Sequence, residues 1–343
     1  MPLDPKDYSY YLPDNLIADQ PSKIRDHCRL LCLNRKTGEI NHQNFFDLKS
    51  ILGPNDVLVL NQSKVFPARL FAKKDSGGDI EVLLIRQIKS DLWLAISKPR
   101  PKIGQQIFFG HNLIGEVIKS DQTTGQITLK FNFKNANFFQ ILDKIGHTPI
   151  PPYISSNQTE LQIREEYQTV YAKDIGSAAA PTAGLHFTRQ LLSELKSRGV
   201  QIEYITLHVG LGTFQNLRPE NLESKTLHSE FYEIKPNVAK RLNLAKQQGK
   251  RIIGVGTTSV RTLESATISN QVQPGQNSTN IFIYPGIKFK FIDAIITNFH
   301  LPESSLLMLV SAFSSKEIIL KSYQEAIEKK YRFFSFGDAM FIS

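Results

Sequence analysis

The chain has 343 residues, of which 41% are hydrophobic and 21% charged, and this composition predicts a globular protein of about two domains. It contains no run of about 18 apolar residues and no signal-like N-terminus, so we expect no transmembrane helix and a cytoplasmic location. The 41 Lys and Arg residues outnumber the 32 Asp and Glu residues, and the resulting net charge of +9 favours a polyanionic partner such as nucleic acid.

The N-terminal part of the chain predicts an α/β unit. The segment DVLVLN, residues 56–61, is a short apolar run closed by an asparagine and is typical of a buried strand. His27, Cys28 and Cys32 lie close together, but these ligands fall short of a structural zinc site, and an iron–sulfur cluster normally takes four thiolates. We therefore interpret CRLLCL, residues 28–33, as a buried strand and expect no metal site.

Residues 67–146 change character and predict a small all-β antiparallel barrel. Strand-like runs such as DIEVLLIRQI, LWLAISK and QITLKFNF are separated by turn clusters such as DSGG, PRPKIG and DQTTG. Short strands at regular spacing, without a helical period, are typical of a barrel or sandwich. We expect this domain to be inserted into a discontinuous α/β main domain, barrel-like in form, that comprises residues 1–66 and 147–343.

The C-terminal part alternates between helices and strands. Thr188 is expected to cap a helix over 189–198, and Asn237 is expected to cap a helix that ends at Gly249. The polar segment 269–280 contains Gly and Pro and is interpreted as a linker-like loop. The other expected strands are 200–210, 251–256, 281–286, 291–299 and 333–342, and the other expected helices are 257–266, 302–313 and 316–331.

The turn between strand 251–256 and helix 257–266 is the first candidate site. The strand ends in Gly-x-Gly and continues into Thr257, Thr258 and Ser259, so that backbone N–H groups and three hydroxyls meet at a helix start. Such a start favours a carboxylate or a phosphate. A third glycine and a downstream acidic residue are missing, so the segment is not a dinucleotide-binding fingerprint. An ordinary capped turn explains the pattern equally well.

Several candidate reactive groups lie at the ends of expected strands or in nearby loops. The histidines are His186, His208 and His300; the segment LHSEFYEI adds His228 and Glu230, and FSFGDAM adds Asp338. Each histidine alone would be a structural residue, but open α/β sheets bind ligands beyond the carboxyl ends of their strands. We therefore expect the histidines and the Thr257 turn to share one cavity. Aromatic neighbours suit a flat base or a cationic centre, although core packing also explains them; they are Phe187, Phe214 and Phe299.

Long motifs resemble those of one known family. PTAGLHFT, HVGLGTF, LHSE, GVGTTSVRTLES, TNFHLPESSLLMLVSAF and YRFFSFGDAMFI closely resemble motifs of the S-adenosylmethionine:tRNA ribosyltransferase-isomerase family of queuosine biosynthesis. YLPDNLIADQP, DVLVLNQSKVFPARL and GHTPIPPY extend the resemblance almost to both ends of the chain. The family's architecture, an α/β domain with an inserted β-barrel, agrees with the expected elements.

The resemblance implies a specific reaction and specific partners. The ribosyl part of S-adenosylmethionine is transferred and isomerised onto 7-aminomethyl-7-deazaguanine at the wobble position of a tRNA with a queuosine-type anticodon, giving epoxyqueuosine-tRNA, adenine and methionine. A base removes a proton beside the sulfonium, the ylide expels adenine and opens the ribose, the tRNA amine adds, and methionine leaves as the epoxide closes. S-adenosylmethionine is a co-substrate, no cofactor is expected, and we expect a monomer.

Residue roles follow from the resemblance. His186, His208 and His300 precede Glu230 and Asp338 as candidates for the base, because the ordinary histidine pKa of about 6.5 suits proton transfer near neutrality. His186→Ala is expected to abolish turnover with an almost unchanged melting curve. The candidate substrate-binding residues are Thr182, Gly184, Phe187, Gly210, Gly212, Thr213, Phe214, Thr257, Thr258, Ser259, Arg261 and Phe299. The candidate tRNA phosphate contacts, for which solvated surface is the alternative, are Lys98, Arg100, Lys102, Lys329, Lys330 and Arg332.

Finer expectations concern the small-residue segment and the Thr257 turn. GSAAAPTAGLHFT, residues 176–188, carries no formal charge and is expected to form a wall against which the adenosyl group or the 7-deazaguanine lies flat. Thr257, Thr258 and Ser259 would hold the methionine carboxylate, with Arg261 adding charge. The chain departs from the family's usual pattern at four positions, which puts any contact made there in doubt: Tyr11, Gln62, Lys64 and Glu166.

The sequence leaves three rival functions open. An S-adenosylmethionine-dependent methyltransferase and a nicotinamide dehydrogenase both suit a doubly wound sheet, but the missing glycine-and-acid fingerprint counts against both. A non-catalytic RNA-binding protein would use the β insert to grip RNA.

Overall fold

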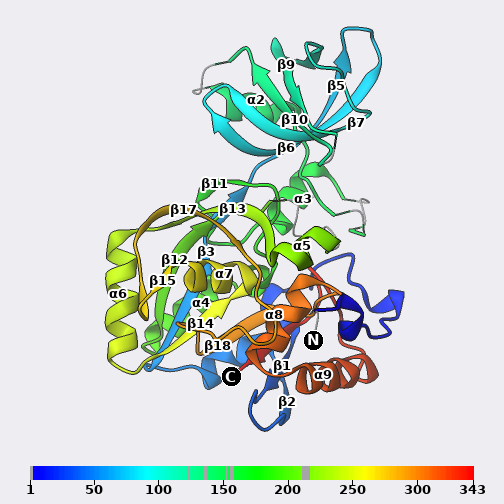
Figure 1. Ribbon diagram of the computed structural model, residues 1–343. Coiled ribbons are helices and arrows are strands. Elements are labelled where there is room, and N and C mark those ends of the chain that lie inside the picture. Colours follow the sequence, from blue (N-terminus) through cyan, green and yellow to red (C-terminus); the bar gives the residue numbers. More distant parts are fainter. Residues whose placement is uncertain (1–2, 123, 134–136, 152, 155–157, 211–216) are drawn as a thin grey trace.

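The computed structural model describes residues 3–122, 124–133, 137–151, 153–154, 158–210 and 217–343. Figure 1 shows a main domain built on a large sheet and, above it, a smaller domain of cyan and green strands. The α/β class and the all-β barrel are therefore confirmed. The large sheet is nine-stranded and open, with β17 and β2 at its edges, which corrects the barrel-like form expected for the main domain.

Four parallel strands form the centre of the large sheet. They are β12 (Gln201–Leu207), β3 (Asp56–Asn61), β14 (Arg251–Val255) and β18 (Ala294–Asn298). Every residue of β3 is buried, as is usual for a central parallel strand covered on both faces. The carboxyl ends of these four strands meet at one edge of the sheet, which is where the candidate site lies.

Further strands extend the sheet on both sides. On one side, β13 (Thr226–Ile234) pairs antiparallel with β12, and β17 (Gly275–Ile281) pairs antiparallel with β13. On the other side follow β19 (Ala339–Ile342), β1 (Arg29–Leu33) and β2 (Ile40–Asn44). The expected cysteine-containing strand is thus confirmed as β1.

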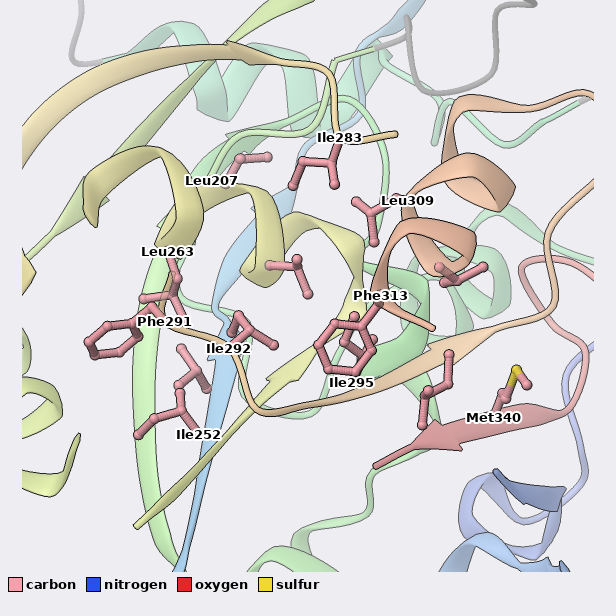
Figure 2. Close-up of a cluster of buried hydrophobic side chains, with 14 of the residues drawn as sticks. Leu207, Ile252, Leu263, Ile283, Phe291, Ile292, Ile295, Leu309, Phe313 and Met340 are labelled. Carbon is pink, nitrogen blue, oxygen red and sulfur yellow. The ribbon is translucent and has the colours of Figure 1, made fainter. Parts of the chain in front are cut away.

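Helices cover both faces of the sheet, and the side chains of β3 alternate between the two cores. Val57 and Val59 pack with Leu263 of α7 (Gly256–Ala266) in the larger core, whose residues Figure 2 shows. Leu58 and Leu60 belong to a second core on the opposite face. The helices of the larger core are α6 (Pro236–Gln247), α7, α8 (Ser305–Phe313) and α9 (Lys316–Glu328), and those of the second core are α1 (Leu48–Ile51) and α4 (Arg189–Ser197).

The smaller domain is a closed antiparallel barrel with its own core. Its strands are β5 (Arg69–Lys74), β6 (Asp79–Lys89), β7 (Leu92–Lys98), β8 (Gln106–Gly110), β9 (Leu113–Ser120) and β10 (Gln126–Phe131). Alternate residues point inward, as in β8, where Ile107 and Phe109 are buried between exposed neighbours. The helix α2 (Phe138–Ile145) packs Phe138 and Leu142 against this core. The limits 67 and 146 of the insert remain predictions.

Short elements connect the two domains and complete the main one. The strands β4 (Ser63–Val65) and β11 (Asp174–Ser177) pair in parallel, and β15 (Thr267–Ile268) pairs with β16 (Gln271–Val272). The remaining α-helices of the described chain are α3 (Glu160–Glu166) and α5 (Pro219–Ser224), and Thr182–His186 of the small-residue segment form a 3-10 helix.

Several local expectations are corrected. The supposed loop 269–280 contains β16 and most of β17. The helix assigned to Asn237 begins at Pro236 after an N-cap at Lys235, and α8 is capped by Ser304 rather than starting at Pro302. Thr188, however, caps α4 as expected, since its side chain accepts a hydrogen bond from the Leu191 amide. In the described part of the chain, no helix is long and apolar enough to cross a membrane.

Candidate active site

Three of the predicted site segments lie at the carboxyl ends of neighbouring parallel strands. His208 directly follows β12, Thr257 follows the end of β14, and His300 follows the end of β18 by two residues. The expected clustering at one sheet edge is therefore observed for these three segments.

A first cavity at this edge is formed by the main domain alone, and we call it the threonine pocket. Its lining residues are Ala180, Pro181, Thr182, Ala183, Val209, Gly256, Thr257, Thr258, Thr297, Asn298, Phe299, His300, Leu306, Phe334 and Ser335. Residues 180–183 of the small-residue segment form part of this lining, so the segment does lie along a cavity.

The hydroxyls of the threonine pocket differ in how they are paired. Thr182 donates a hydrogen bond to Oδ1 of Asn298 (3.1 Å), and the Thr297 hydroxyl lies 3.0 Å from Nε2 of His300. Thr258 is only 8% exposed, and its hydroxyl has no hydrogen-bond partner among the described residues. This unpaired hydroxyl stands at the N-terminus of α7, whose first-turn N–H groups favour an anion.

His300 and Phe299 form the deep part of the pocket beside β18. Burial lowers the pKa of His300 to about 3, so its imidazole is neutral near pH 7. Phe299 is fully buried and packs edge-on against Tyr323 and Tyr331. Both residues line the pocket. Phe299 also packs in the larger core, which was the alternative explanation for this aromatic residue.

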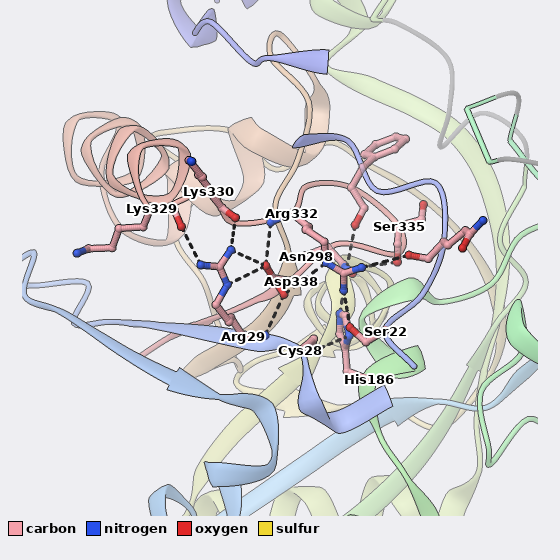
Figure 3. A network of polar contacts seen from close by, with 12 residues as sticks. Ser22, Cys28, Arg29, His186, Asn298, Lys329, Lys330, Arg332, Ser335 and Asp338 are labelled. Atoms are coloured by element: carbon pink, nitrogen blue, oxygen red, sulfur yellow. Dashed lines mark hydrogen bonds and ion pairs between the residues drawn. The ribbon is translucent and has the colours of Figure 1, made fainter. Parts of the chain in front are cut away.

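His186 lies behind the threonine pocket and is not among the described residues that line it. Its Nε2 atom lies 3.0 Å from the side-chain nitrogen of Asn298, and its Nδ1 atom lies 3.2 Å from Sγ of Cys28 (Figure 3). Burial, with Arg332 and Arg25 adding positive charge nearby, lowers the pKa of His186 to about 3. His186 thus contacts Asn298, which does line the pocket, and its direct contact with the reacting centre stays a prediction.

A second hollow, which we call the interdomain cleft, lies between the barrel and the main domain. The barrel contributes Ile85, Arg86, Gln87, Trp93, Leu94, Ile96, Thr124 and Gln126, together with Phe139 of α2. The main domain contributes Ile175, Gly176, His208, Gly210, Leu217, Arg218, Asn221, Leu227, His228, Ser229, Glu230, Phe231, Ser278 and Ser305. The two parts of this cleft share Ile85, Arg86, Gly210 and Ser229, and are therefore continuous.

His208 forms part of the main-domain wall of the cleft. Its ring stacks on Phe231, with centroids 5.7 Å apart and planes inclined by 15°. A Cβ atom on Gly176 would lie 2.6 Å from this ring, which explains why glycine occupies that position in the small-residue segment. Burial lowers the pKa of His208, although Asp174 and Glu233 oppose this change.

Glu230 and Arg261 form a buried ion pair at the base of the cleft. Their exposed fractions are 3% and 4%, and Nη1 of Arg261 contacts Oε2 of Glu230. The other carboxylate oxygen accepts a hydrogen bond from the Gly210 amide (3.0 Å) and lies 3.1 Å from Nε2 of His228. Burial raises the pKa of Glu230, but Arg261, His228 and the Gly210 amide outweigh it and bring the pKa down to about 2. Arg261 thus forms an ion pair with Glu230, and its expected role beside the methionine carboxylate stays a prediction.

The threonine pocket and the interdomain cleft adjoin each other. Val209 lines the pocket and Gly210 lines the cleft, while Leu306 and Ser305 divide in the same way. Two neighbouring cavities are therefore present instead of the single cavity that was expected. At both places where they meet, consecutive residues of the chain line different cavities.

Asp338 and Arg332 lie in a structural network at the end of the sheet (Figure 3). The Asp338 carboxylate accepts hydrogen bonds from the amides of Arg29 (2.9 Å) and Arg332 (2.8 Å) and forms an ion pair with the Arg29 side chain. The Arg332 side chain donates to Ser22 and to the Gln20 carbonyl. These partners favour a structural role for both residues over proton transfer or phosphate binding.

The other basic candidates lie on the surface. Lys98, Arg100 and Lys102 are exposed on the barrel, and Lys329 and Lys330 are exposed after α9. Their role in tRNA binding remains a prediction.

Four residues depart from the family's usual pattern. Two of them have exposed side chains, and the other two form hydrogen bonds with neighbouring side chains. Tyr11 is 82% exposed and Lys64 is exposed. Gln62 is buried and donates to Asp174, while Glu166 accepts from the Gln158 side chain.

The remaining substrate-binding candidates do not line either cavity in the described structure. Gly184 packs so closely on Tyr171 that a Cβ atom would lie 2.1 Å from its hydroxyl. Phe187 is fully buried in the second core, and Ser259 is fully buried within α7. Three further candidates lie outside the described residues, namely Gly212, Thr213 and Phe214.

Two functional candidates were missed at the level of sequence. Asn298 connects His186 to the pocket, and Arg86 reaches the cleft from the barrel. His228, which the motif LHSEFYEI indicated together with Glu230, contacts the Glu230 carboxylate, since residues two apart on a strand share a face.

Comparison with known proteins covers almost the whole chain. The model of the family described as queuosine biosynthesis protein matches residues 5–342. The S-adenosylmethionine:tRNA ribosyltransferase-isomerase of Carboxydothermus hydrogenoformans is 49% identical over 339 residues, which cover 98% of this chain and 99% of the relative. The protein of the same name from Desulforamulus reducens is 50% identical over 341 residues, covering 98% of each chain.

A solved structure is similar over the same extent. The crystal structure of S-adenosylmethionine tRNA ribosyltransferase from Thermotoga maritima has a TM-score of 0.55 and 36% sequence identity to this chain. The match covers 98% of this chain and all of the other, and it therefore includes both domains.

Proposed function

The chain belongs to the queuosine biosynthesis protein family, and from this premise we propose how its two cavities serve an S-adenosylmethionine:tRNA ribosyltransferase-isomerase. The enzyme transfers and isomerises the ribosyl part of S-adenosylmethionine onto 7-aminomethyl-7-deazaguanine in tRNA, giving epoxyqueuosine-tRNA, adenine and methionine. The observation that carries this function is the near-full-length identity of about half to two enzymes of that name.

The threonine pocket binds the methionine end of S-adenosylmethionine in this proposal. Its support is the unpaired, buried hydroxyl of Thr258 at the N-terminus of α7, with Thr257 beside it. A carboxylate placed there would accept hydrogen bonds from the hydroxyl and from first-turn amides and would interact favourably with the helix dipole. The wall formed by residues 180–183 offers a smooth surface to the rest of the ligand.

The interdomain cleft receives the modified base of the tRNA. It adjoins the threonine pocket at Gly210, so that the aminomethyl group and the ribosyl carbon would meet at this boundary. Trp93 and Phe231 provide aromatic surface, and Arg86 provides positive charge on the barrel wall. The wobble position of a queuosine-type anticodon is the substrate in this proposal; the monomeric state, the cytoplasmic location and the absence of a cofactor remain predictions.

Product analysis separates this function from its rivals. The protein is incubated with S-adenosylmethionine and a substrate tRNA that carries the aminomethyl-deazaguanine, and the small molecules are measured by liquid chromatography with mass detection. Release of adenine and methionine in equal amounts is expected. S-adenosylhomocysteine would instead indicate a methyltransferase, and tRNA binding without either product would indicate a non-catalytic RNA-binding protein.

A further inference from the structure

His228 occupies a special place on the wall of the interdomain cleft. Its side chain is one-third exposed and lines the part of the cleft that faces Arg86 of the barrel. The pairing of β13 with β17 shifts register between Thr226 and Glu230, the interval that contains His228. Such irregularities re-aim side chains and are frequent beside active sites.

The other histidines at this sheet edge are less suited to exchanging a proton with a ligand. His186 and His300 are buried, with ring nitrogens that face Asn298 and Thr297. The His208 ring is held between Phe231 and Gly176. Of the described histidines that line the cleft, His228 is the one whose ring nitrogen lies within 3.1 Å of a buried carboxylate.

We propose that His228 is the general base that removes the proton beside the sulfonium of S-adenosylmethionine, with Glu230 and Arg261 as positioning residues; this inference rests on the proposed function. Nε2 of His228 faces Glu230, which leaves Nδ1 for the substrate. Nδ1 takes a proton from C5′ of the ribose, and the C–H electron pair remains on C5′ as a sulfonium ylide. The C5′ electron pair then forms a C4′=C5′ double bond as the C4′–O4′ bond breaks, and O4′ forms the C1′ carbonyl as the C1′–N9 bond to adenine breaks. The imidazolium returns the proton to the departing adenine, so that His228 ends the step neutral.

The surroundings of His228 favour this cycle. The Glu230 carboxylate stabilises the imidazolium that forms, as a carboxylate does in other histidine-dependent enzymes. Arg261 and the Gly210 amide fix the carboxylate, so that it does not need to reorganise during the reaction. Arg86 and Arg218 are the other charged residues that line this part of the cleft.

The test compares His228→Gln with His27→Gln, a matched exchange at an exposed histidine that is not among the described lining of either cavity. Glutamine keeps an amide near Glu230 but cannot act as a base. Three quantities are measured with S-adenosylmethionine and substrate tRNA: single-turnover adenine release, incorporation of solvent deuterium at C5′, and the Kd for S-adenosylmethionine by calorimetry. We expect His228→Gln to lower adenine release and deuterium incorporation by a factor on the order of 10² to 10⁴, with a Kd close to that of the wild type.

The outcomes separate the inference from the function on which it rests. Adenine release by His228→Gln at the wild-type rate would overturn the role of His228 while leaving the proposed function intact, and so would a loss confined to the Kd. If the wild type itself releases no adenine, the proposed function fails. In Glu230→Gln, the acidic limb of the pH–rate profile should move to lower pH, because the imidazolium loses its carboxylate. An unchanged limb in a folded Glu230→Gln protein would remove Glu230 from the positioning role.

Discussion

The two cavities at the sheet edge hold their buried polar groups in opposite ways. The interdomain cleft contains a buried pair of full charges, with Glu230 held by Arg261 and by the Gly210 amide. In the threonine pocket, the groups are neutral, since His300 is uncharged near pH 7 and the Thr258 hydroxyl has no partner in the described structure. A paired charge is ready to stabilise a charge that appears during a reaction, whereas an unpaired neutral donor is ready to bind a ligand. The difference fits the proposed function, in which the pocket binds the ligand and the neighbouring cleft transfers the proton.

Removing Arg261 should have the largest effect on stability. Arg261→Met leaves the Glu230 carboxylate buried without its cation, and we expect the free energy of unfolding to fall by about 3–5 kcal/mol. Urea denaturation measures this change. Lys73→Met, which breaks the exposed pair with Asp79, should leave the free energy of unfolding near the wild-type value. Equal losses in the two variants would contradict the paired-charge description of the cleft.

The same pair predicts a dependence of stability on pH. The folded-state pKa of Glu230, about 2, lies below its ordinary value of 4.5, so Glu230 contributes stability above pH 4.5 that is lost as the pH falls towards 2. Denaturation curves across this window should show a smaller loss in Arg261→Met than in the wild type. The same loss in both proteins would mean that Arg261 does not set the ionisation of Glu230.

Truncation of His186 tests the polar contacts that support the wall of the threonine pocket. His186→Ala removes the contacts of its ring with Asn298 and Cys28 and opens a cavity beside Phe45. We expect the free energy of unfolding to fall by roughly 2–4 kcal/mol, together with a loss of turnover as Asn298 loses its support. This prediction differs from the expectation, made from the sequence, of an almost unchanged melting curve. Thermal denaturation against the exposed control His27→Ala checks it, and coincident curves would restore the earlier expectation.

The unpaired hydroxyl of Thr258 allows a test of binding alone. In Thr258→Val we expect the Kd for S-adenosylmethionine to rise roughly fivefold to tenfold, the loss of one hydrogen bond of about 1 kcal/mol. The melting temperature should not fall, because no internal hydrogen bond is removed. Thr262→Val on the same helix is the control, since its hydroxyl donates to the Thr258 carbonyl (2.8 Å) and it is not part of the described pocket lining. An unchanged Kd in Thr258→Val would place the ligand elsewhere.

The smallest expected effect concerns the barrel wall of the cleft. Arg86→Gln should weaken tRNA binding a few-fold and lower the slope of log Kd against log salt by about 1, as expected for one lost phosphate contact. Filter binding at several salt concentrations measures the slope. Lys240→Gln on α6 is the control, because this exposed lysine is not among the described lining of either cavity. If both variants keep the wild-type slope, Arg86 makes no phosphate contact.

The sequence predicted best what depends on local pattern. The apolar run of β3 and the alternation of the barrel strands identified both domains. This was possible because the pattern of apolar and polar residues along a strand indicates which of its faces are buried. β17 was missed because it is a polar edge strand that owes its place to backbone pairing with β13, with Thr279 the main inward-facing side chain.

The candidate site was predicted in part. The ends of β12, β14 and β18 were correctly placed together, because parallel strands share a carboxyl edge. Pairing over long separations was not visible: Arg261 and Glu230 lie 31 positions apart, and His186 and Asn298 lie 112 apart. Composition alone does not indicate which charged residue will neutralise which.

The two cavities are lined by different sets of domains, and this difference affects the order in which the two substrates could bind and leave. The threonine pocket is lined by the main domain alone, whereas the cleft is lined by both domains. A change in the orientation of the barrel relative to the main domain would therefore alter the width of the cleft and leave the threonine pocket unchanged. Under the proposed function, tRNA could then be exchanged while S-adenosylmethionine stays bound in the pocket.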